Sequence, residues 1–483
     1  MKLSFPTRFP PAYMLTSAGI LFVAAWVEGT DLVMAALAAT FLILSGLAFN
    51  AAGGLVYPSG AYVFFLATLS VGVGTAAKLL AGEPLDSNLR APIKSMLVYN
   101  AGMLTIYAAA TLNRHLRRKR PLLGNMLVNA RMDQIAMGCI LIGIAGPLVV
   151  PESAAATFAQ INNFLPFAIL LPVYARARET DGESTFNWIS FGAWAYSTIV
   201  FGLLTFSKQG IYSASVAWAV AALAAGYRIG KVRLLALTVV AVVASSILTP
   251  YSQIGRQFRG AADLNDQAIY LLEHPLETRE LYALQSERES RRHKSDIHWF
   301  EHSQGLLDRL TMFPIDDALI AMTDQGHSRT LYVYATYLMN SVPHLFFPDK
   351  PNILWGNEFA HEIGMLSPAD HTTSISFSPF SDAYHVGQWQ VIFFIAPFMF
   401  FVLFYVTDSV AGSTNQTAWA LLYVLYFSHT APEGMMATTV YGSTTFTIAV
   451  ILGAFVVARI TPLLGQLVTL PKPLAPQGVA VKS

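Results

Sequence analysis

Five basic residues in the sequence could bind a phosphate group close to a membrane surface. All lie at or near the ends of apolar segments: Lys208, Arg256, Arg259, Arg329 and Lys350. The planar guanidinium of arginine matches phosphate oxygens, and the lysine ammonium acts as a compact point charge. A basic side chain at a span end also often just reaches along apolar surface to water. Taken as a group, however, the five predict a site for a lipid-linked diphosphate.

Acid and base candidates gather slightly later in the chain. The three we favour for orienting or deprotonating a sugar hydroxyl are Asp382, His371 and His385. Histidine exchanges a proton near neutral pH, which suits general base catalysis. A single histidine is more often an ordinary hydrogen-bonded side chain, and several others compete for the role: His327, His344, His361, Glu358 and Asp370. The sequence therefore leaves the identity of the base open.

Two short motifs have the spacing of metal-peptidase sites. HWFEH (His298–His302) has the H-x-x-E-H spacing, and HEIGM (His361–Met365) lacks the second histidine of H-E-x-x-H. Zinc also needs a third protein ligand, and no companion motif supplies one. No acidic pair with divalent-metal spacing stands out either. We therefore predict a metal-independent protein without a cofactor.

The elements that must position these residues are membrane helices. Only 12% of the 483 residues are charged and 54% are hydrophobic, with a mean hydropathy of +0.48, whereas soluble domains are about 25% charged. A net charge of +1 argues against a nucleic-acid partner. A spanning helix needs roughly 20 mostly apolar residues. Twelve segments qualify: 11–27, 31–50, 57–79, 97–113, 134–151, 156–175, 187–206, 211–227, 233–250, 391–407, 416–430 and 440–459.

Basic loops predict the orientation of these spans, because short cytoplasmic loops are rich in lysine and arginine. With the N-terminus inside, the strongly basic connections all fall on one side: Arg114–Arg120, Arg176 and Arg178, and Arg228 to Arg233. We expect an all-α polytopic membrane protein with both termini cytoplasmic.

Most of the predicted spans contain no ionisable residue near their middle. This disfavours an ion-coupled carrier, which usually has ionisable groups within its spans.

This orientation divides the chain into four parts. We expect a block of about nine spans in 1–250, a large extracytoplasmic region of helices and loops in 251–390, about three spans in 391–459 and a cytoplasmic tail in 460–483. Within the large region, 263–303 is predicted as a solvated charged helix and 306–321 as an amphipathic segment. The apolar run 331–347 is predicted to be a re-entrant or interfacial element. The prolines from Pro343 to Pro379 predict an extended course.

Three stretches resemble the bacterial O-antigen polymerase family, the Wzy-like oligosaccharide repeat-unit polymerases. SKQG (Ser207–Gly210) is similar to a small-residue turn with one basic residue, and VPHLFFPDKP (Val342–Pro351) to a segment I-P-R-x-x-x-P-x-K-P. The run Ser374–Gly387 is similar to a serine-containing stretch that leads to an acidic residue, an aromatic and a glycine. His344 stands where the family often has arginine, and Asp382 where glutamate is usual.

The resemblance, which covers 199–394, implies a glycosyltransferase of the bacterial inner membrane. A glycan on a polyprenyl diphosphate would move onto the non-reducing end of one lipid-linked repeat unit at the periplasmic face. The partners would be the lipid-linked oligosaccharide, the bilayer and a chain-length regulator. The five basic residues would bind the diphosphate. Asp382, His371 and His385 would orient or deprotonate the acceptor hydroxyl.

Three alternatives remain open from the sequence. An O-antigen ligase would use the same chemistry with another acceptor. A flippase or transporter for lipid-linked sugars would move its substrate without forming a bond. A membrane zinc peptidase would use His298, Glu301 and His302.

Overall fold

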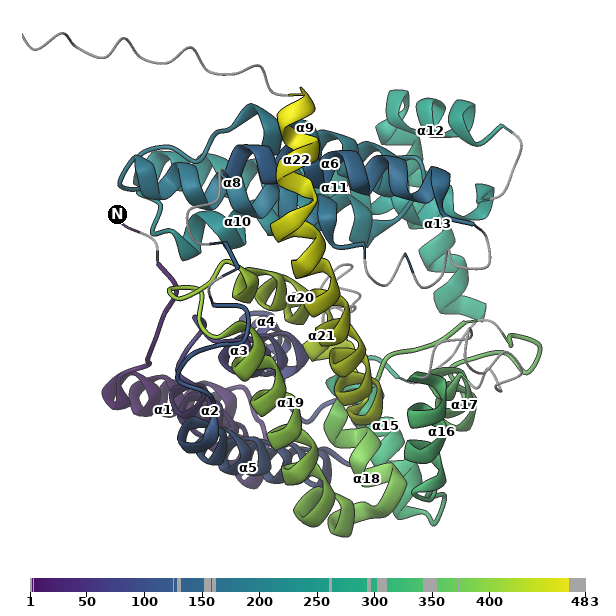
Figure 1. The fold of residues 1–483 in the computed structure, drawn as a ribbon. Helices are drawn as coiled ribbons and strands as arrows, with labels where there is room; N and C mark the ends of the chain where they lie inside the picture. Colours follow the sequence, from purple (N-terminus) through teal and green to yellow (C-terminus); the bar gives the residue numbers. More distant parts are fainter. Residues whose placement is uncertain are drawn as a thin grey trace, which may run out of the picture.

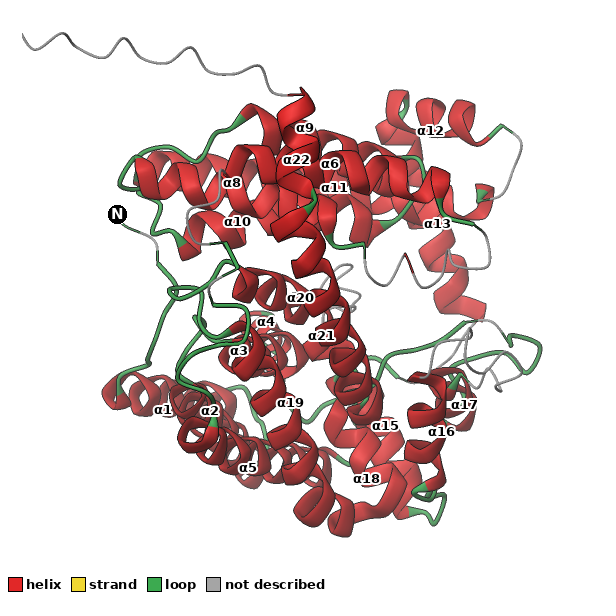
Figure 2. Cartoon of the chain, in the orientation of Figure 1, coloured by secondary structure: helices red, strands yellow, loops and turns green. Residues whose placement is uncertain are grey.

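The computed structural model describes residues 2 and 4–468, apart from 125, 128–131, 152–157, 159–161, 260–262, 293–296, 302–310, 342–353 and 372. Figures 1 and 2 show that this part of the chain consists of helices joined by turns and loops. Apart from an isolated antiparallel bridge between Lys2 and Arg228, the regular elements in the described residues are all helices.

The N-terminal helices lie close together in one part of the molecule (Figure 1). They are α1 (Pro11–Val27), α2 (Leu32–Ala52), α3 (Pro58–Ala67), the π-helical η1 (Thr68–Gly72), α4 (Val73–Leu80) and α5 (Pro92–Leu116). Asp31 caps α2, since its Oδ1 accepts hydrogen bonds from Val33 N at 2.8 Å and Met34 N at 3.2 Å. Gly53 ends α2 with a φ of +96°, which a residue without a Cβ adopts readily.

A second group of helices gathers around α6 (Figure 1). It contains α6 (Met132–Val149), α8 (Phe164–Glu179), α9 (Trp188–Thr198), η2 (Ile199–Leu203), α10 (Lys208–Ala224), α11 (Lys231–Gly255), η3 (Arg256–Phe258) and the late helix α22 (Thr461–Val468). A Cβ on Gly138 would lie 2.1 Å from Thr461 O, so glycine allows α6 and α22 to approach closely. Helix α11 is apolar but is buried only between Thr249 and Gly255, as expected for a helix that faces lipid.

The remaining helices complete the bundle. From the predicted extracytoplasmic region come α12 (Leu264–Glu273), α13 (Pro275–Arg292), α15 (Phe313–Asp324), α16 (Tyr332–Ser341), α17 (Trp355–Glu362) and α18 (Pro379–Gln390). The chain continues through η4 (Val391–Ile395), α19 (Ala396–Ala411), α20 (Trp419–Glu433) and α21 (Met436–Arg459). Helices α15 and α18 pack against each other and against α5, so part of the polar region belongs to the main core.

Seven helical segments in the described residues are long and apolar enough to cross a membrane. They are Leu32–Ala52, Pro58–Leu80, Pro92–Leu116, Met132–Val149, Lys231–Phe258, Pro379–Ala411 and Met436–Arg459. Two shorter apolar segments are Pro11–Val27 and Trp188–Leu203. This agrees with a polytopic α-helical membrane protein.

The polar region differs from expectation in two places. Asp316 and Asp317, in the segment predicted as amphipathic, are almost fully buried, because backbone and hydroxyl donors around them replace water. The stretch predicted as extended contains α17, and Pro379 begins α18 at the first helical position, where proline is tolerated. Within 331–347, residues 332–341 form α16, which packs against α21. The rest of that run lies outside the described residues.

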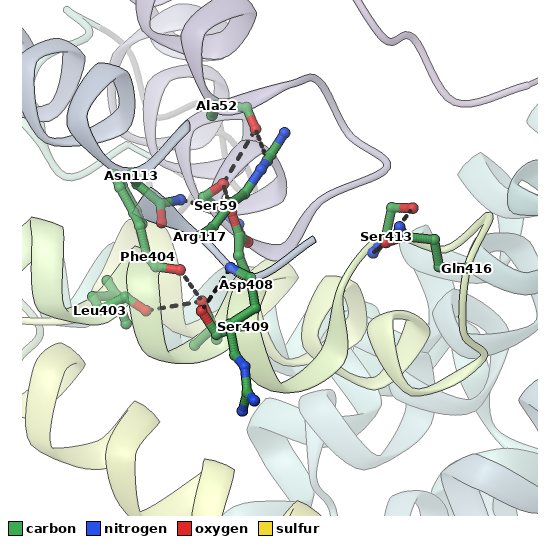
Figure 3. A network of polar contacts seen from close by, with 12 residues as sticks. Ala52, Ser59, Asn113, Arg117, Leu403, Phe404, Asp408, Ser409, Ser413 and Gln416 are labelled. Carbon is green, nitrogen blue, oxygen red and sulfur yellow. Dashed lines mark hydrogen bonds and ion pairs between the residues drawn. The ribbon is translucent and has the colours of Figure 1, made fainter. Parts of the chain in front are cut away.

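A buried carboxylate joins three of the membrane helices (Figure 3). Asp408 Oδ2 accepts hydrogen bonds from Ser59 Oγ and Asn113 Nδ2, each at 2.7 Å, and its Oδ1 accepts one from Ser59 N at 3.0 Å. Arg117 Nη1 lies 3.5 Å from Asp408 Oδ2, and the Arg117 guanidinium stacks 3.6 Å above the Tyr57 ring. These contacts fix α3, α5 and α19 at one end of the bundle.

Candidate functional site

Three side chains from different elements meet where α15, α17 and α18 converge, and we call them the Arg–Glu–His cluster: Arg329, Glu362 and His385. His385 is fully buried. Its Nδ1 lies 2.9 Å from Thr323 Oγ1, and its Nε2 lies 3.0 Å from Glu362 Oε2. The Phe359 ring meets the imidazole edge to face at 4.6 Å. Both ring nitrogens therefore face a partner, and the imidazole is held in one orientation.

Arg329 closes the cluster on its solvent side. Its Nε donates to Glu362 Oε1 at 2.7 Å, its Nη2 donates to the same oxygen, and its backbone N donates to His385 O at 2.9 Å. Glu358 Oε2 lies 3.9 Å from Nη2, and the Trp355 ring lies 5.7 Å from the guanidinium carbon. The Nη1 edge makes no hydrogen bond within the described part of the chain. A guanidinium has five donors, so this edge can still bind an anion.

Exposure changes steadily across the cluster. The side chain of His385 is 0% exposed, that of Glu362 is 21% exposed and that of Arg329 is 39% exposed. Burial opposes ionisation of Glu362, but its contacts with His385 and Arg329 outweigh burial and lower the pKa of the carboxyl. Glu362 is thus an ionised carboxylate at neutral pH, with its Oε1 bound by Arg329, its Oε2 against His385 and its side chain 21% exposed.

A second polar group lies beside the cluster at the end of α15. Asp324 accepts a hydrogen bond from Tyr384 Oη at 2.6 Å and lies 3.5 Å from Lys94 Nζ. Lys94 Nζ is also 5.6 Å from the ring centroids of Tyr384 and Trp389. Since Thr323 contacts His385 and Asp324 contacts Tyr384, the last turn of α15 connects the two groups.

Two buried aspartates, Asp316 and Asp317, lie near the start of α15, the helix whose last turn contacts His385. Asp316 accepts hydrogen bonds from Ser378 N at 3.0 Å, from Ser381 Oγ and from Tyr99 Oη. Asp317 accepts from Ser95 Oγ at 2.7 Å and Ala91 N at 3.1 Å. Burial raises the pKa of both carboxyls, against the effect of their donors. These contacts tie α15 to α5 and to the start of α18.

Two features of α18 flank His385: the buried carboxylate of Asp382 and a break in the helix at Gln388. Asp382 is fully buried, and its Oδ2 accepts a hydrogen bond of 2.9 Å from Met436 N, at the start of α21. A carboxylate is favourable at a helix N-terminus. After His385 the helix breaks: Gln388 has φ +50° and ψ −141°, a conformation that costs a non-glycine residue about 1–3 kcal/mol.

The other predicted phosphate ligands lie elsewhere. Lys208 begins α10, and Arg256 begins η3 at the end of α11. Arg259 Nε donates to Thr205 O at 2.9 Å, and its Nη2 donates to Phe206 O at 2.8 Å. These three residues therefore lie around one turn beside α10 and α11, which Figure 1 places away from α15 to α18. Lys350 lies outside the described residues.

The other favoured histidine, His371, lies at the periphery, and His344 lies outside the described residues. His371 is exposed, with its ring 6.1 Å from that of His361, and no contact joins it to His385 among the described residues. In HWFEH, Trp299 and Phe300 are buried, while His298 and Glu301 are exposed; His302 lies outside the described residues. The part of the chain that the structure describes holds no group of three or more His, Cys, Asp or Glu arranged to bind a metal ion.

Comparison of the chain with protein-family models, with curated proteins and with solved structures finds no match. The site is therefore interpreted from its geometry. Sequence reasoning singled out Arg329, His385 and Asp382, noted Glu362 only within the motif HEIGM, and missed Asp316 and Thr323. The spacing of Glu358 and Glu362, four residues apart and hence on one helix face, was the available signal for Glu362.

Proposed function

We propose that this protein is a polysaccharide repeat-unit polymerase of the bacterial inner membrane. It would transfer a glycan from a polyprenyl diphosphate carrier onto a lipid-linked repeat unit at the outer membrane face. The observation that carries the proposal is the Arg–Glu–His cluster, in which one carboxylate contacts both a partly exposed guanidinium and a buried imidazole. The motif resemblance and the polytopic helical fold support the same function.

The proposed reaction breaks the bond between the anomeric carbon and the diphosphate oxygen. A bond forms between that carbon and the acceptor hydroxyl oxygen, and the hydroxyl proton passes to the Glu362 carboxylate. Arg329 would stabilise the charge that develops on the leaving diphosphate through its Nη1 edge. His385 touches neither substrate in this scheme and acts as a positioning residue, because it holds Glu362 from the buried side.

The finer topology is part of the proposal. We propose twelve spans with both termini cytoplasmic and with 251–390 on the periplasmic side. Each of the twelve apolar segments overlaps a helix, which supports this arrangement. Lys208, Arg256 and Arg259 would then lie near the outer surface, where they could bind a second diphosphate, and a chain-length regulator would act from outside.

Polymer length in cells that carry substituted genes tests the proposal. We expect Arg329→Ala and Glu362→Gln to leave mainly single repeat units, and Arg329→Lys to keep partial activity because it retains charge but loses the planar fork. Arg279→Ala and Glu280→Gln, both at exposed positions of α13, are the matched controls. Full-length polymer from correctly inserted Arg329→Ala and Glu362→Gln proteins would refute this role of the cluster.

Two further measurements separate the polymerase from the alternatives. Deletion of the gene should leave single repeat units, whereas loss of a ligase leaves long chains on the carrier. Purified protein should convert lipid-linked repeats into longer chains, which a flippase does not do.

A further inference from the structure

A large apolar groove lies between the first helices, remote from the Arg–Glu–His cluster in sequence. Its volume is about 870 Å³, and it is lined by α1, α2 and the continuous segment α3–η1–α4. The lining is mostly hydrocarbon and aromatic. Of its few polar groups, the Ser45 hydroxyl donates to Phe41 O at 2.7 Å. The Thr75 hydroxyl has no hydrogen-bond partner among the described residues, and the otherwise apolar interior suits an alkyl chain.

The two mouths of the groove carry opposite charges. At one mouth Phe9 lines the groove, and reciprocal hydrogen bonds of 2.8 and 2.9 Å with Asn50 hold its backbone to the end of α2. Arg8, next to Phe9, is exposed there. Arg114, also exposed, lies at the same end, because α5 runs parallel to α2: Asn100 bonds to Leu37 O and Arg117 to Ala52 O.

The opposite mouth is acidic. Leu79 and Leu80 line it, and the α1–α2 turn that faces it carries Glu28 and Asp31. Asp86 joins them, since its Oδ2 accepts a hydrogen bond of 3.0 Å from Asp31 N. An anionic head group is therefore favoured at the Arg8 mouth and repelled at the Asp31 mouth.

The length of the groove matches a hydrocarbon chain that crosses one leaflet. Along α1 the lining runs from Tyr13 to Ala24, roughly 17 Å at 1.5 Å per residue. One leaflet contributes about 15 Å, half of the ~30 Å hydrocarbon core. Along α3–η1–α4 the lining continues to Leu80, toward the acidic mouth. The region lined by all three walls thus has about the length of one acyl chain that enters from the basic end.

We propose that this groove binds an anionic glycerophospholipid, with an acyl chain inside and the phosphate near Arg8 and Arg114. Such a site is independent of the proposed polymerase reaction. A bound lipid would fill the space between α1 and the α3–η1–α4 wall, and would make the packing of α1 depend on the lipid composition of the bilayer.

Photocrosslinking tests the proposal on the full-length protein. The protein is reconstituted in phosphatidylcholine vesicles that contain a little phosphatidylglycerol with a photoreactive acyl chain, and labelled peptides are mapped. We expect labelling on α1, α2 and η1. Ala67→Phe and Ala24→Phe, which place a ring in the groove, should each lower this labelling about tenfold. Ala36→Phe, at an exposed position of α2 outside the lining, should leave it unchanged.

The head group is tested with a phosphatidylcholine probe that carries the same photoreactive chain. Wild-type protein should prefer the phosphatidylglycerol probe, and Arg8→Gln should lower that preference about fivefold. Equal labelling by the two probes, or equal labelling of Ala67→Phe and Ala36→Phe, would overturn the proposal. So would displacement of the probe by polyprenyl phosphate more effectively than by unlabelled phosphatidylglycerol. Elution of each variant as one species in detergent excludes misfolding.

Discussion

Glu362 is the side chain on which the candidate site depends. It is the side chain that contacts both the Arg329 guanidinium and the His385 imidazole. The carboxylate lies between the two side chains: its Oε1 accepts hydrogen bonds from Arg329, and its Oε2 lies 3.0 Å from Nε2 of the fully buried His385.

Glu362→Gln should lower stability by about 2 kcal/mol, a typical value for lost hydrogen bonds to a charged group. The pKa of Glu362 is lowered by folding, so its stabilising effect is full above the unfolded pKa of about 4.3 and is lost as pH falls through the folded pKa. The difference in melting temperature between wild type and variant should therefore be constant near neutral pH and should narrow below about pH 4. A difference that widens in acid would contradict this assignment.

At the scale of helices, α18 differs most from what the sequence predicted. The apolar run after Trp389 predicts a span, and η4 and α19 form there. The helix nevertheless begins at Pro379, and its polar face is buried against α15 and α5. Serine, aspartate and histidine in PFSDAYHV indicate a solvent-exposed segment in isolation. Only the donors and acceptors that distant elements supply make their burial possible, and a local pattern cannot reveal those partners.

Gln388→Gly should stabilise the joint between α18 and η4. Glycine adopts φ +50° with ψ −141° without the clash that a side chain meets, which should recover about 1 kcal/mol. Thermal unfolding in detergent measures the change, with Gln390→Gly, in ordinary helical backbone, as the control that should lose stability. A variant less stable than the control would argue against strain.

Asp382→Asn should lower the stability of the contact with α21 and should change the rate of polymer formation only slightly. Its carboxylate accepts from Met436 N and is turned toward α21, so replacement should cost about 1 kcal/mol of stability, the usual value of a helix N-terminal contact. We expect polymer yield per folded molecule within about threefold of wild type, or ~0.7 kcal/mol. Loss of polymer without loss of stability would instead restore Asp382 as a catalytic residue.

At the scale of the whole molecule, the sequence predicted helices well and their assembly poorly. Each apolar segment predicts a helix by itself, because a run of about 20 apolar residues can cross a bilayer with its backbone hydrogen bonds satisfied only as a helix. Which cations meet depends on contacts between distant segments. Lys208, Arg256 and Arg259 gather at one turn because Gly255 packs on Phe206, and Arg329 lies with α17 and α18. Neither grouping follows from spacing along the chain.

Asp408→Ala should destabilise the bundle by about 3 kcal/mol, because it leaves Arg117 without its buried charge partner. Ser59 and Asn113 would also lose an acceptor. The temperature at which the protein loses its monodisperse state in detergent should fall clearly. Asp266→Ala, at an exposed position of α12, should change it little. An unchanged Asp408→Ala protein would show that water replaces the carboxylate there.

The same contact constrains the order in which the protein can be made. Ser59 and Asp408 lie 349 residues apart, so synthesis at about 5–20 residues per second separates them by roughly 20–70 s. Until Asp408 is made, the nascent N-terminal helices hold Ser59, and later also Asn113 and Arg117, without their acceptor. A ribosome that stalls before Asp408 would therefore release a fragment whose membrane helices contain Ser59 and Asn113 without this acceptor, a target for membrane quality-control proteases. Co-expression of the missing C-terminal segment should protect that fragment from degradation.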